Sequence, residues 1–312
     1  ITELSVDLSR IGQSAASRTY MHWDKAIISS RDAIFPPQNQ HRHWDGSCET
    51  IVIDGPHLPE WSTLINRFLI DKTLVESRFR RSISTYDSEA TVQQRIASHL
   101  WQLWQKHLHN AINPDAVIEI GPGTGSFTRL YTERLHPQTL LLWDLAPSTA
   151  QLPSTVIGCD AEIALMEQPS ESADAIVSAS TIQWFNSVGN FFRQSLRVLR
   201  PGGILAASTF GNQTFRELTQ AGSSSLPYTD MESLRTLIPD GFKILEFHDG
   251  IITRMFDAPI DVLRHIKATG VNAIRRQADP ISIRNLMVNY PKSPDGRAPI
   301  TYNPIYIVLQ KS

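Results

Sequence analysis

Val117-Ile118-Glu119-Ile120-Gly121-Pro122-Gly123-Thr124-Gly125-Ser126-Phe127-Thr128 reads as a short strand, a glycine-rich turn and the first turn of a helix. The apolar residues before the turn suit a parallel strand that is covered on both faces. The GxGxG spacing lets the backbone turn tightly and approach a ligand where a Cβ would collide. A dinucleotide-binding fingerprint would have its next glycine at Ser126. Glu119 is unexpected at a buried strand position unless it has a partner.

The composition is that of an ordinary globular protein. Of the 312 residues, 41% are hydrophobic and 19% are charged, and the formal net charge is -2. That charge gives no overall field that would favour nucleic acid or a membrane, so we expect neither as a partner. Cys48 and Cys159 match no metal-binding spacing, so we expect no metal site and two free thiols in the cytoplasm. Because the chain begins at Ile1, we expect it to be a piece of a longer or processed polypeptide.

The N-terminal part contains two predicted strands, 25–30 and 50–54, each followed by a polar residue of interest. Asp32 follows the first strand and His57 the second, which is the order of the last two triad members in an α/β-hydrolase. The stretches ISSRDAIFPPQNQ and IDGPHLPEW resemble the C-terminal end of the pimeloyl-acyl-carrier-protein methyl ester esterases of biotin synthesis. The alternative is that Asp32 caps a turn and His57 is a loop histidine. Since no GxSxG nucleophile elbow precedes Asp32, we expect residues 1–68 to be a hydrolase remnant without esterase activity.

Residues 69–312 are predicted to form a second domain. Two helices open it, over about 69–86 and 90–109, and Asp87 or Ser88 is expected to cap the second helix. Strands and helices then alternate in the rhythm of a parallel sheet. Asp144 ends the second strand, 19 residues beyond Gly125, where a carboxylate can accept both ribose hydroxyl protons of an adenosine.

The glycine loop, the acidic strand ends and LRPGG before the fifth strand together resemble class I S-adenosylmethionine methyltransferases. The resemblance implies an α/β fold: a Rossmann-like sheet with helices on both faces, a helical N-terminal lid and a late helical insert. It also implies S-adenosylmethionine as the cofactor, with Asp160, beyond the third strand, facing the adenine amino group. The cofactor-binding residues expected from this resemblance are Glu119, Gly121, Gly123, Gly125, Asp144, Leu145, Asp160, Ala161 and Ser178.

Five further stretches resemble the malonyl-acyl-carrier-protein O-methyltransferases of biotin synthesis, the BioC family: FRRSISTYD, SASTIQWF, STFGNQTFREL, HIKATGVN and PITYNPIYIVL. The resemblance implies methylation of the free carboxylate of malonyl-acyl carrier protein, and the adjacent esterase remnant suggests a bifunctional fusion. The chain departs from the family pattern at Ser178 or Ala179, where the family has asparagine, and at Asn303, where it often has histidine.

Few catalytic residues are expected, because a carboxylate is already ionised at neutral pH and needs no general base. The residues expected to shape the acceptor site are Tyr86, Gln183, Trp184 and Tyr302. The alternatives are that Trp184 packs beneath the end of the sheet and that Tyr302 hydrogen-bonds the backbone in the last strand. The basic residues expected to dock the acidic carrier are Arg264, Lys267, Arg275 and Arg276; the alternative is a solvated helix face. Two rival functions remain open: a methyltransferase for another small acceptor, and a non-catalytic scaffold.

Overall fold

The computed structural model describes residues 70–108, 114–223, 228–271 and 283–312, together with the backbone of five strands between residues 4 and 54. The chain divides into two compact units. One consists of Ile1–Ile70 with Phe185–Asn190, and the other of Asp71–Trp184 with Phe191–Ser312. Among the described residues, no helix has the length and apolar character needed to cross a membrane.

The N-terminal unit contains one five-stranded sheet with the order β1-β2-β3-β5-β4, in which every neighbouring pair is antiparallel. The strands are β1 Leu4–Asp7, β2 Arg18–His22, β3 Lys25–Ile28, β4 Gln40–Trp44 and β5 Glu49–Asp54. The two strands predicted from the sequence are β3 and β5, and they pair with each other. Asp32 and His57 lie outside the described residues.

The larger unit is organised around a seven-stranded sheet with the order β11-β14-β10-β9-β6-β7-β8. The strands, in that order, are Phe242–Asp249, Pro304–Lys311, Leu199–Phe210, Ala173–Ser178, Ala116–Ile120, Thr139–Asp144 and Val156–Gly158. The five strands from β10 to β8 are parallel, and β14 is antiparallel to both β10 and β11. The order reverses between β6 and β9, and ligands of such sheets bind at the carboxyl ends of the strands there.

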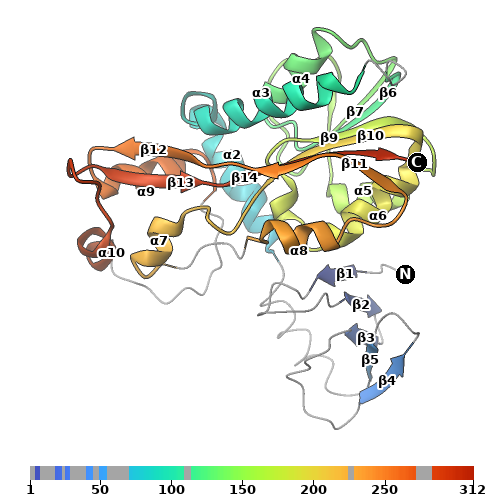
Figure 1. Ribbon diagram of the computed structural model, residues 1–312, viewed down its shortest axis with the longest axis horizontal. Coiled ribbons are helices and arrows are strands. Elements are labelled where there is room, and N and C mark those ends of the chain that lie inside the picture. The colour runs from blue at the N-terminus through green and yellow to red at the C-terminus, as the bar shows by residue number, and fades with distance from the viewer. Residues whose placement is uncertain are drawn as a thin grey trace. The chain divides into compact units, whose positions relative to one another are not determined.

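Helices cover both faces of this sheet, as the sequence predicts (Figure 1): α3 and α4 lie on one face, and α5 and α6 on the other. The first helices are α2 Lys72–Glu89, α3 Thr91–Lys106, α4 Ser126–Thr132, α5 Ala161–Glu167, the 3-10 turn η3 Ile182–Trp184 and α6 Val188–Val198. The expected N-cap of α3 is wrong, because the cap residue is Ala90 without a side-chain hydrogen bond. Asp87 lies within α2 instead, and its carboxylate accepts a hydrogen bond from the Thr124 hydroxyl.

The late insert expected from the sequence is present and combines short helices with a two-stranded antiparallel ribbon. Its elements are α7 Arg216–Gln220, α8 Met231–Thr236, β12 Ile252–Phe256, α9 Pro259–Ala268, α10 Ile283–Asn289 and β13 Ala298–Tyr302. In Figure 1 the ribbon, α9 and α10 extend beyond one end of the main sheet.

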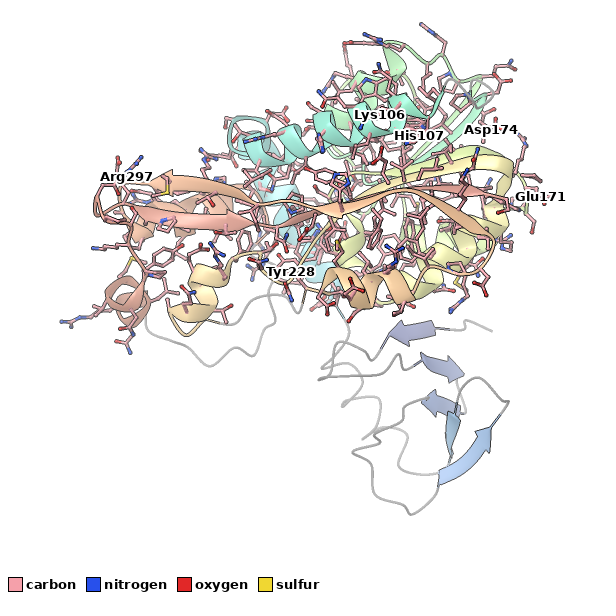
Figure 2. All side chains as sticks on the ribbon, viewed as in Figure 1. Lys106, His107, Glu171, Asp174, Tyr228 and Arg297 are labelled. Atoms are coloured by element: carbon pink, nitrogen blue, oxygen red, sulfur yellow. The ribbon has the colours of Figure 1, made fainter. Side chains whose placement is uncertain are left out.

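The two ends of the parallel strands differ in chemistry. At the amino ends, the Asp174 carboxylate accepts hydrogen bonds from the backbone of Asp115 and Ala116 at 3.0 and 2.9 Å, which ties β9 to the start of β6. Figure 2 shows Asp174 at one edge of the molecule and Tyr228 well away from it. The Tyr228 ring packs against Phe210, the last residue of β10, with ring centroids 6.2 Å apart. Aromatic residues therefore gather near the carboxyl ends, where the site is expected.

Candidate active site

The glycine loop after β6 has the backbone that its sequence predicts. Gly121, Gly123 and Gly125 have φ angles of 71°, 55° and 86°, in the left-handed region that favours glycine. A Cβ on Gly121 would lie 2.2 Å from Thr181 Oγ1, whereas a Cβ on Gly123 would meet no atom of the described residues within 4 Å. The middle glycine therefore faces open space that a ligand can fill, while Gly121 allows close packing against the chain after β9.

Asp144 ends β7 and lies directly beside this loop. Its Oδ2 accepts a hydrogen bond from the Gly123 backbone N–H at 2.9 Å, and its Oδ1 accepts one from Ala146 at 2.8 Å. Burial raises the pKa of Asp144, although the two backbone hydrogen bonds and the nearby Arg80 oppose that rise. Leu145 follows in the same turn and is half-buried. The structure thus brings together the glycine loop and the carboxylate expected to hold a ribose.

Asp160 is the N-cap of α5, and its carboxylate accepts a hydrogen bond from the Glu162 backbone N–H at 3.0 Å. The Lys72 ammonium lies 2.6 Å from Asp160 Oδ1 and also pairs with Glu162. Ala161, the first residue of α5, is buried. Sequence reasoning did not single out Lys72, which lies 88 residues before its partner. It connects the start of α2 to the expected adenine side of the site.

Glu119 is buried within β6, with 1% of its surface exposed, and it has the partner that its position demands. The Tyr131 hydroxyl on α4 donates a hydrogen bond to Glu119 Oε2 at 2.7 Å. Burial raises the pKa of Glu119 to about 7, although the hydroxyls of Tyr131 and Thr128 oppose the rise. Ser178 is also buried, and its hydroxyl donates to the Ile120 carbonyl at 3.0 Å. This bond joins the ends of β9 and β6 below the glycine loop.

Tyr86 and Trp184, two residues expected at the acceptor site, belong to one aromatic group. The Phe79 ring contacts both of them, with centroids 6.4 Å from Tyr86 and 5.7 Å from Trp184. Burial raises the pKa of Tyr86, and the Asp144 carboxylate raises it further. Tyr86 therefore lies within electrostatic reach of Asp144, the carboxylate expected to bind the cofactor. Gln183 directly precedes Trp184 in η3 and donates from Nε2 to the Ser180 carbonyl at 2.6 Å.

Tyr302, the remaining residue expected at the acceptor site, is almost fully buried at the end of β13. Its ring packs against Phe215 and Phe210 at centroid distances of 5.1 and 6.1 Å. Its hydroxyl lies 2.7 Å from His265 Nε2, a partner that sequence reasoning missed. Burial raises the pKa of Tyr302, Arg254 opposes the rise, and the proximity of Tyr86 adds to it. The phenol of Tyr86 therefore contributes to the electrostatics at Tyr302, although the two residues lie on elements at opposite ends of the domain sequence.

The positions that depart from the family pattern have structural partners of their own. Asn303 is buried, and its amide donates to Asp249 Oδ2 and to the Gly250 carbonyl, both at 2.9 Å. Ala179 follows the buried Ser178 at the end of β9 and is half-buried.

The expected carrier-docking residues are only partly within the described chain. Arg264 and Lys267 lie on the exposed side of α9, and Arg264 pairs with Asp261 at 2.7 Å. Arg275 and Arg276 lie outside the described residues. The opposite side of α9 buries Val262, His265 and Ile266, so the helix has one apolar and one basic side.

Parts of the chain match known protein families and solved structures. A family model described as "Methyltransferase domain" matches residues 118–207, and one described as "Pimeloyl-ACP methyl esterase BioG" matches residues 2–68. Among solved structures, the YcgJ protein from Bacillus subtilis is 13% identical with a TM-score of 0.45, and the match covers 69% of this chain and 98% of that protein.

Several curated relatives carry the name malonyl-[acyl-carrier protein] O-methyltransferase. The protein from Bacteroides fragilis is 33% identical over the whole of this chain, which spans 66% of that relative's length. The protein from Bacteroides thetaiotaomicron is 31% identical over 78% of this chain and 99% of its own length. The glycine loop, its carboxylates and this nearly complete match to a relative lead to one conclusion. The chain is an S-adenosylmethionine-dependent methyltransferase and belongs to the malonyl-[acyl-carrier protein] O-methyltransferase family.

Proposed function

We propose that this chain transfers a methyl group from S-adenosylmethionine to the free carboxylate of malonyl-acyl carrier protein, giving the malonyl methyl ester that primes pimeloyl synthesis for biotin. One observation carries the proposal: the chain matches 99% of the length of the Bacteroides thetaiotaomicron relative, whose name states this acceptor. The glycine loop that faces open space, with Asp144 beside it, supports a working cofactor site rather than a scaffold.

The residues at the carboxyl ends of β6, β7 and β8 fit the cofactor. We propose that the loop backbone at Gly121 and Gly123 and the carboxylates of Asp144 and Asp160 would hold it, together with Glu119, Gly125, Leu145, Ala161 and Ser178. An adenosine can occupy the open space at Gly123, where a side chain would otherwise stand. When bound, S-adenosylmethionine supplies a methyl group activated by a positively charged sulfur.

The protein's own contribution to catalysis is positioning. A carboxylate with an ordinary pKa of about 4 is ionised at neutral pH, so no side chain has to remove a proton from it. Holding the acceptor oxygen in line with the methyl carbon, and excluding water, can supply most of the acceleration. Tyr86, Trp184 and Tyr302 suit that role because they are large and mostly apolar, and Tyr86 lies within electrostatic reach of Asp144. Gln183, whose amide is held by the Ser180 carbonyl, would line the same wall.

Mass spectrometry of malonyl-carrier protein after incubation with the full chain and S-adenosylmethionine tests the proposal. We expect one added methyl group, and none when the acceptor carries an acetyl group instead. Equal turnover of free malonyl-coenzyme A would favour a small-molecule methyltransferase. Absence of specific heat on titration with S-adenosylmethionine would instead favour a scaffold.

We propose that the basic side of α9 docks the acidic carrier through Arg264 and Lys267, with Arg275 and Arg276 further along the chain. Exposed cations attract an acidic partner at a distance and raise its association rate. Reversing the charge at Arg264 and Lys267 together should raise the KM for malonyl-carrier protein and leave the Kd for S-adenosylmethionine unchanged. Lys243, exposed on β11, is a matched control for charge reversal. Unchanged kinetics in the double variant would exclude this docking site.

We also propose that residues 1–68 and 69–312 are separate domains, the first derived from the esterase family whose model matches residues 2–68. Asp32 and His57 would be the triad members of that remnant. We propose the cytoplasm as the compartment of the enzyme, since its two cysteines are too few for a disulfide framework.

A further inference from the structure

His265 joins three distant parts of the methyltransferase domain. It lies on the buried side of α9, and only 2% of its surface is exposed. Its Nε2 lies 2.7 Å from the Tyr302 hydroxyl at the end of β13, and its Nδ1 lies 2.9 Å from Glu89 Oε2 at the end of α2. Glu89 is 176 residues away from His265 in sequence and Tyr302 is 37 residues away. This buried imidazole, with a hydrogen-bond partner at each ring nitrogen, connects α2, the first helix of the expected lid, to Tyr302 of the expected acceptor site.

The direction of these hydrogen bonds follows from the chemistry of the partners. Burial lowers the pKa of His265, and Arg254 lowers it too, so the neutral imidazole prevails at neutral pH despite the opposing effect of Glu89. A neutral imidazole has one N–H donor and one acceptor nitrogen, and an ionised carboxylate only accepts. Nδ1 has two neighbours, the Glu89 carboxylate at 2.9 Å and the Arg254 guanidinium at 3.2 Å. We assign the proton to Nδ1, which donates to Glu89, because that contact is the shorter of the two and an ionised carboxylate can only accept. Nε2 then accepts the hydroxyl proton of Tyr302.

Arg254 on β12 holds the Glu89 end of this chain in place. Its guanidinium donates to the Glu89 backbone carbonyl at 3.0 Å and lies 3.7 Å from the Glu89 carboxylate. It also stacks over the Phe256 ring at 5.1 Å, which limits its movement. Arg254 also lies 3.2 Å from His265 Nδ1, where its positive charge offsets the negative charge of the Glu89 carboxylate. The charged and titratable groups around the imidazole are thus Glu89 on α2, Arg254 on β12 and Tyr302 on β13.

Fixing the Tyr302 hydroxyl has a consequence for the acceptor site. The proton of Tyr302 points to His265, so the phenol oxygen presents lone pairs elsewhere, and the ring cannot turn without breaking a buried hydrogen bond. Breaking such a bond costs about 1–3 kcal/mol. A second contact supports the same junction, because the Thr85 hydroxyl donates to the Ala268 carbonyl of α9 at 2.9 Å. Tyr86 directly follows Thr85 on α2, so the junction holds the helix carrying Tyr86 against α9.

We propose that His265 is a positioning residue for methyl transfer. Through Glu89 and Tyr302 it holds the two tyrosine walls of the acceptor site, Tyr86 and Tyr302, at a fixed separation. The proposal rests on the proposed carboxyl methyltransferase function. It differs from the simpler explanation that His265 is a core histidine with satisfied hydrogen bonds, because that explanation predicts an effect on stability without a selective effect on kcat.

Steady-state kinetics of the full chain with malonyl-carrier protein test the proposal. Misplacing reacting groups by about 1 Å can cost a hundredfold in rate. We expect H265Q to lower kcat about 10- to 100-fold, with the KM for the carrier and the Kd for S-adenosylmethionine each within about threefold of the wild-type value. Glu89→Gln keeps an oxygen acceptor for Nδ1 and should lower kcat about two- to fivefold, whereas Glu89→Ala should approach H265Q. His99 on α3 is half-buried and packs against Tyr306 of β14. It provides the control H99Q, which should keep full activity.

A double-mutant cycle separates action through Tyr302 from a general packing defect. In a Y302F background, H265Q should cause a clearly smaller loss of kcat than in the wild-type background, because the Tyr302 hydroxyl is already gone and only the contact with Glu89 remains to be lost. Independent, multiplicative losses would overturn the proposal, as would an unchanged kcat in H265Q. If H265Q does not fold, Glu89→Ala and Glu89→Gln decide the matter, since Glu89 is 36% exposed and its replacement opens no cavity. Failure of the wild-type chain to methylate malonyl-carrier protein would instead refute the proposed function.

Discussion

Replacing Glu119 with glutamine should change how the stability of the protein depends on pH. Glu119 is buried in β6, and burial raises its pKa from 4.5 to about 7, so it is about half protonated at neutral pH. Glutamine has nearly the same shape, and its oxygen can still accept the 2.7 Å hydrogen bond from the Tyr131 hydroxyl. Its amide N–H can donate to the neighbouring Thr128 hydroxyl. E119Q therefore removes a titration and leaves the packing in place.

The magnitude follows from the two pKa values. The native state holds the Glu119 proton more tightly than the unfolded chain, so the native state binds more protons between pH 4.5 and 7. The free energy of unfolding of the wild-type chain consequently falls as pH rises through that window. A difference of 2.5 between the pKa values corresponds to about 3 kcal/mol at 1.36 kcal/mol for each pKa unit, of which about 2.5 kcal/mol lies between pH 5 and pH 8.

Urea denaturation followed by tryptophan fluorescence at pH 5, 6, 7 and 8 measures this effect. We expect the free energy of unfolding of E119Q to gain about 2.5 kcal/mol relative to wild type from pH 5 to pH 8. Glu167, exposed on α5, provides the control E167Q, which removes a surface carboxylate and should leave the wild-type profile unchanged. Infrared spectra should show a protonated carboxyl band near pH 6 that is absent in E119Q. Parallel stability profiles for wild type and E119Q would refute the reasoning.

Three further substitutions probe the loop and the lid helix. Asp144→Asn removes the charge beside the loop and one of the two oxygens that accept backbone hydrogen bonds. We expect calorimetry to show a Kd for S-adenosylmethionine that is about 10- to 100-fold higher, since hydrogen bonds to charged groups contribute about 1.5–3 kcal/mol. Gly125→Ala places a Cβ 2.1 Å from Leu152 at a φ of 86°, and thermal denaturation should show a loss of about 1–3 kcal/mol. Lys72→Met removes the partly buried ion pair with Asp160 and should lower the unfolding free energy by about 1–2 kcal/mol, with a smaller difference in 1 M salt.

The main sheet could be predicted from the sequence because each strand carries its own signal. Apolar runs that end in a glycine turn or an aspartate indicate both the strand and its carboxyl end, as Glu119 before the loop and Asp144 illustrate. The strand order then brings those ends together without further information. The predicted cap of α3 failed for a physical reason: Asp87 has a stronger partner in Thr124, 37 residues away, than the local backbone offers. Local capping rules cannot include a partner that only the folded chain supplies.

Partners such as Lys72 and His265 could not be predicted for the same reason. Lysine near the start of a helix reads as a solvated side chain, and a histidine on an amphipathic helix reads as an ordinary core or surface residue. Their meaning depends on Asp160 and Glu89, which are 88 and 176 residues distant. The sequence contains the side chains of these ion pairs and hydrogen bonds, but only the folded chain contains their pairing.

Through the contacts of Lys72 and Glu89, α2 connects two parts of the proposed site in addition to packing against the domain. Lys72 at its start contacts the expected adenine side, and Glu89 at its end contacts the imidazole that positions Tyr302. Between them, Arg80 lies near enough to Asp144 to oppose the rise in its pKa, and the Asp144 carboxylate raises the pKa of Tyr86. A cationic cofactor that binds beside these carboxylates must therefore alter the electrostatic balance along the whole helix. Because the same helix carries Tyr86, we expect cofactor binding to influence the position of Tyr86 in the proposed acceptor site.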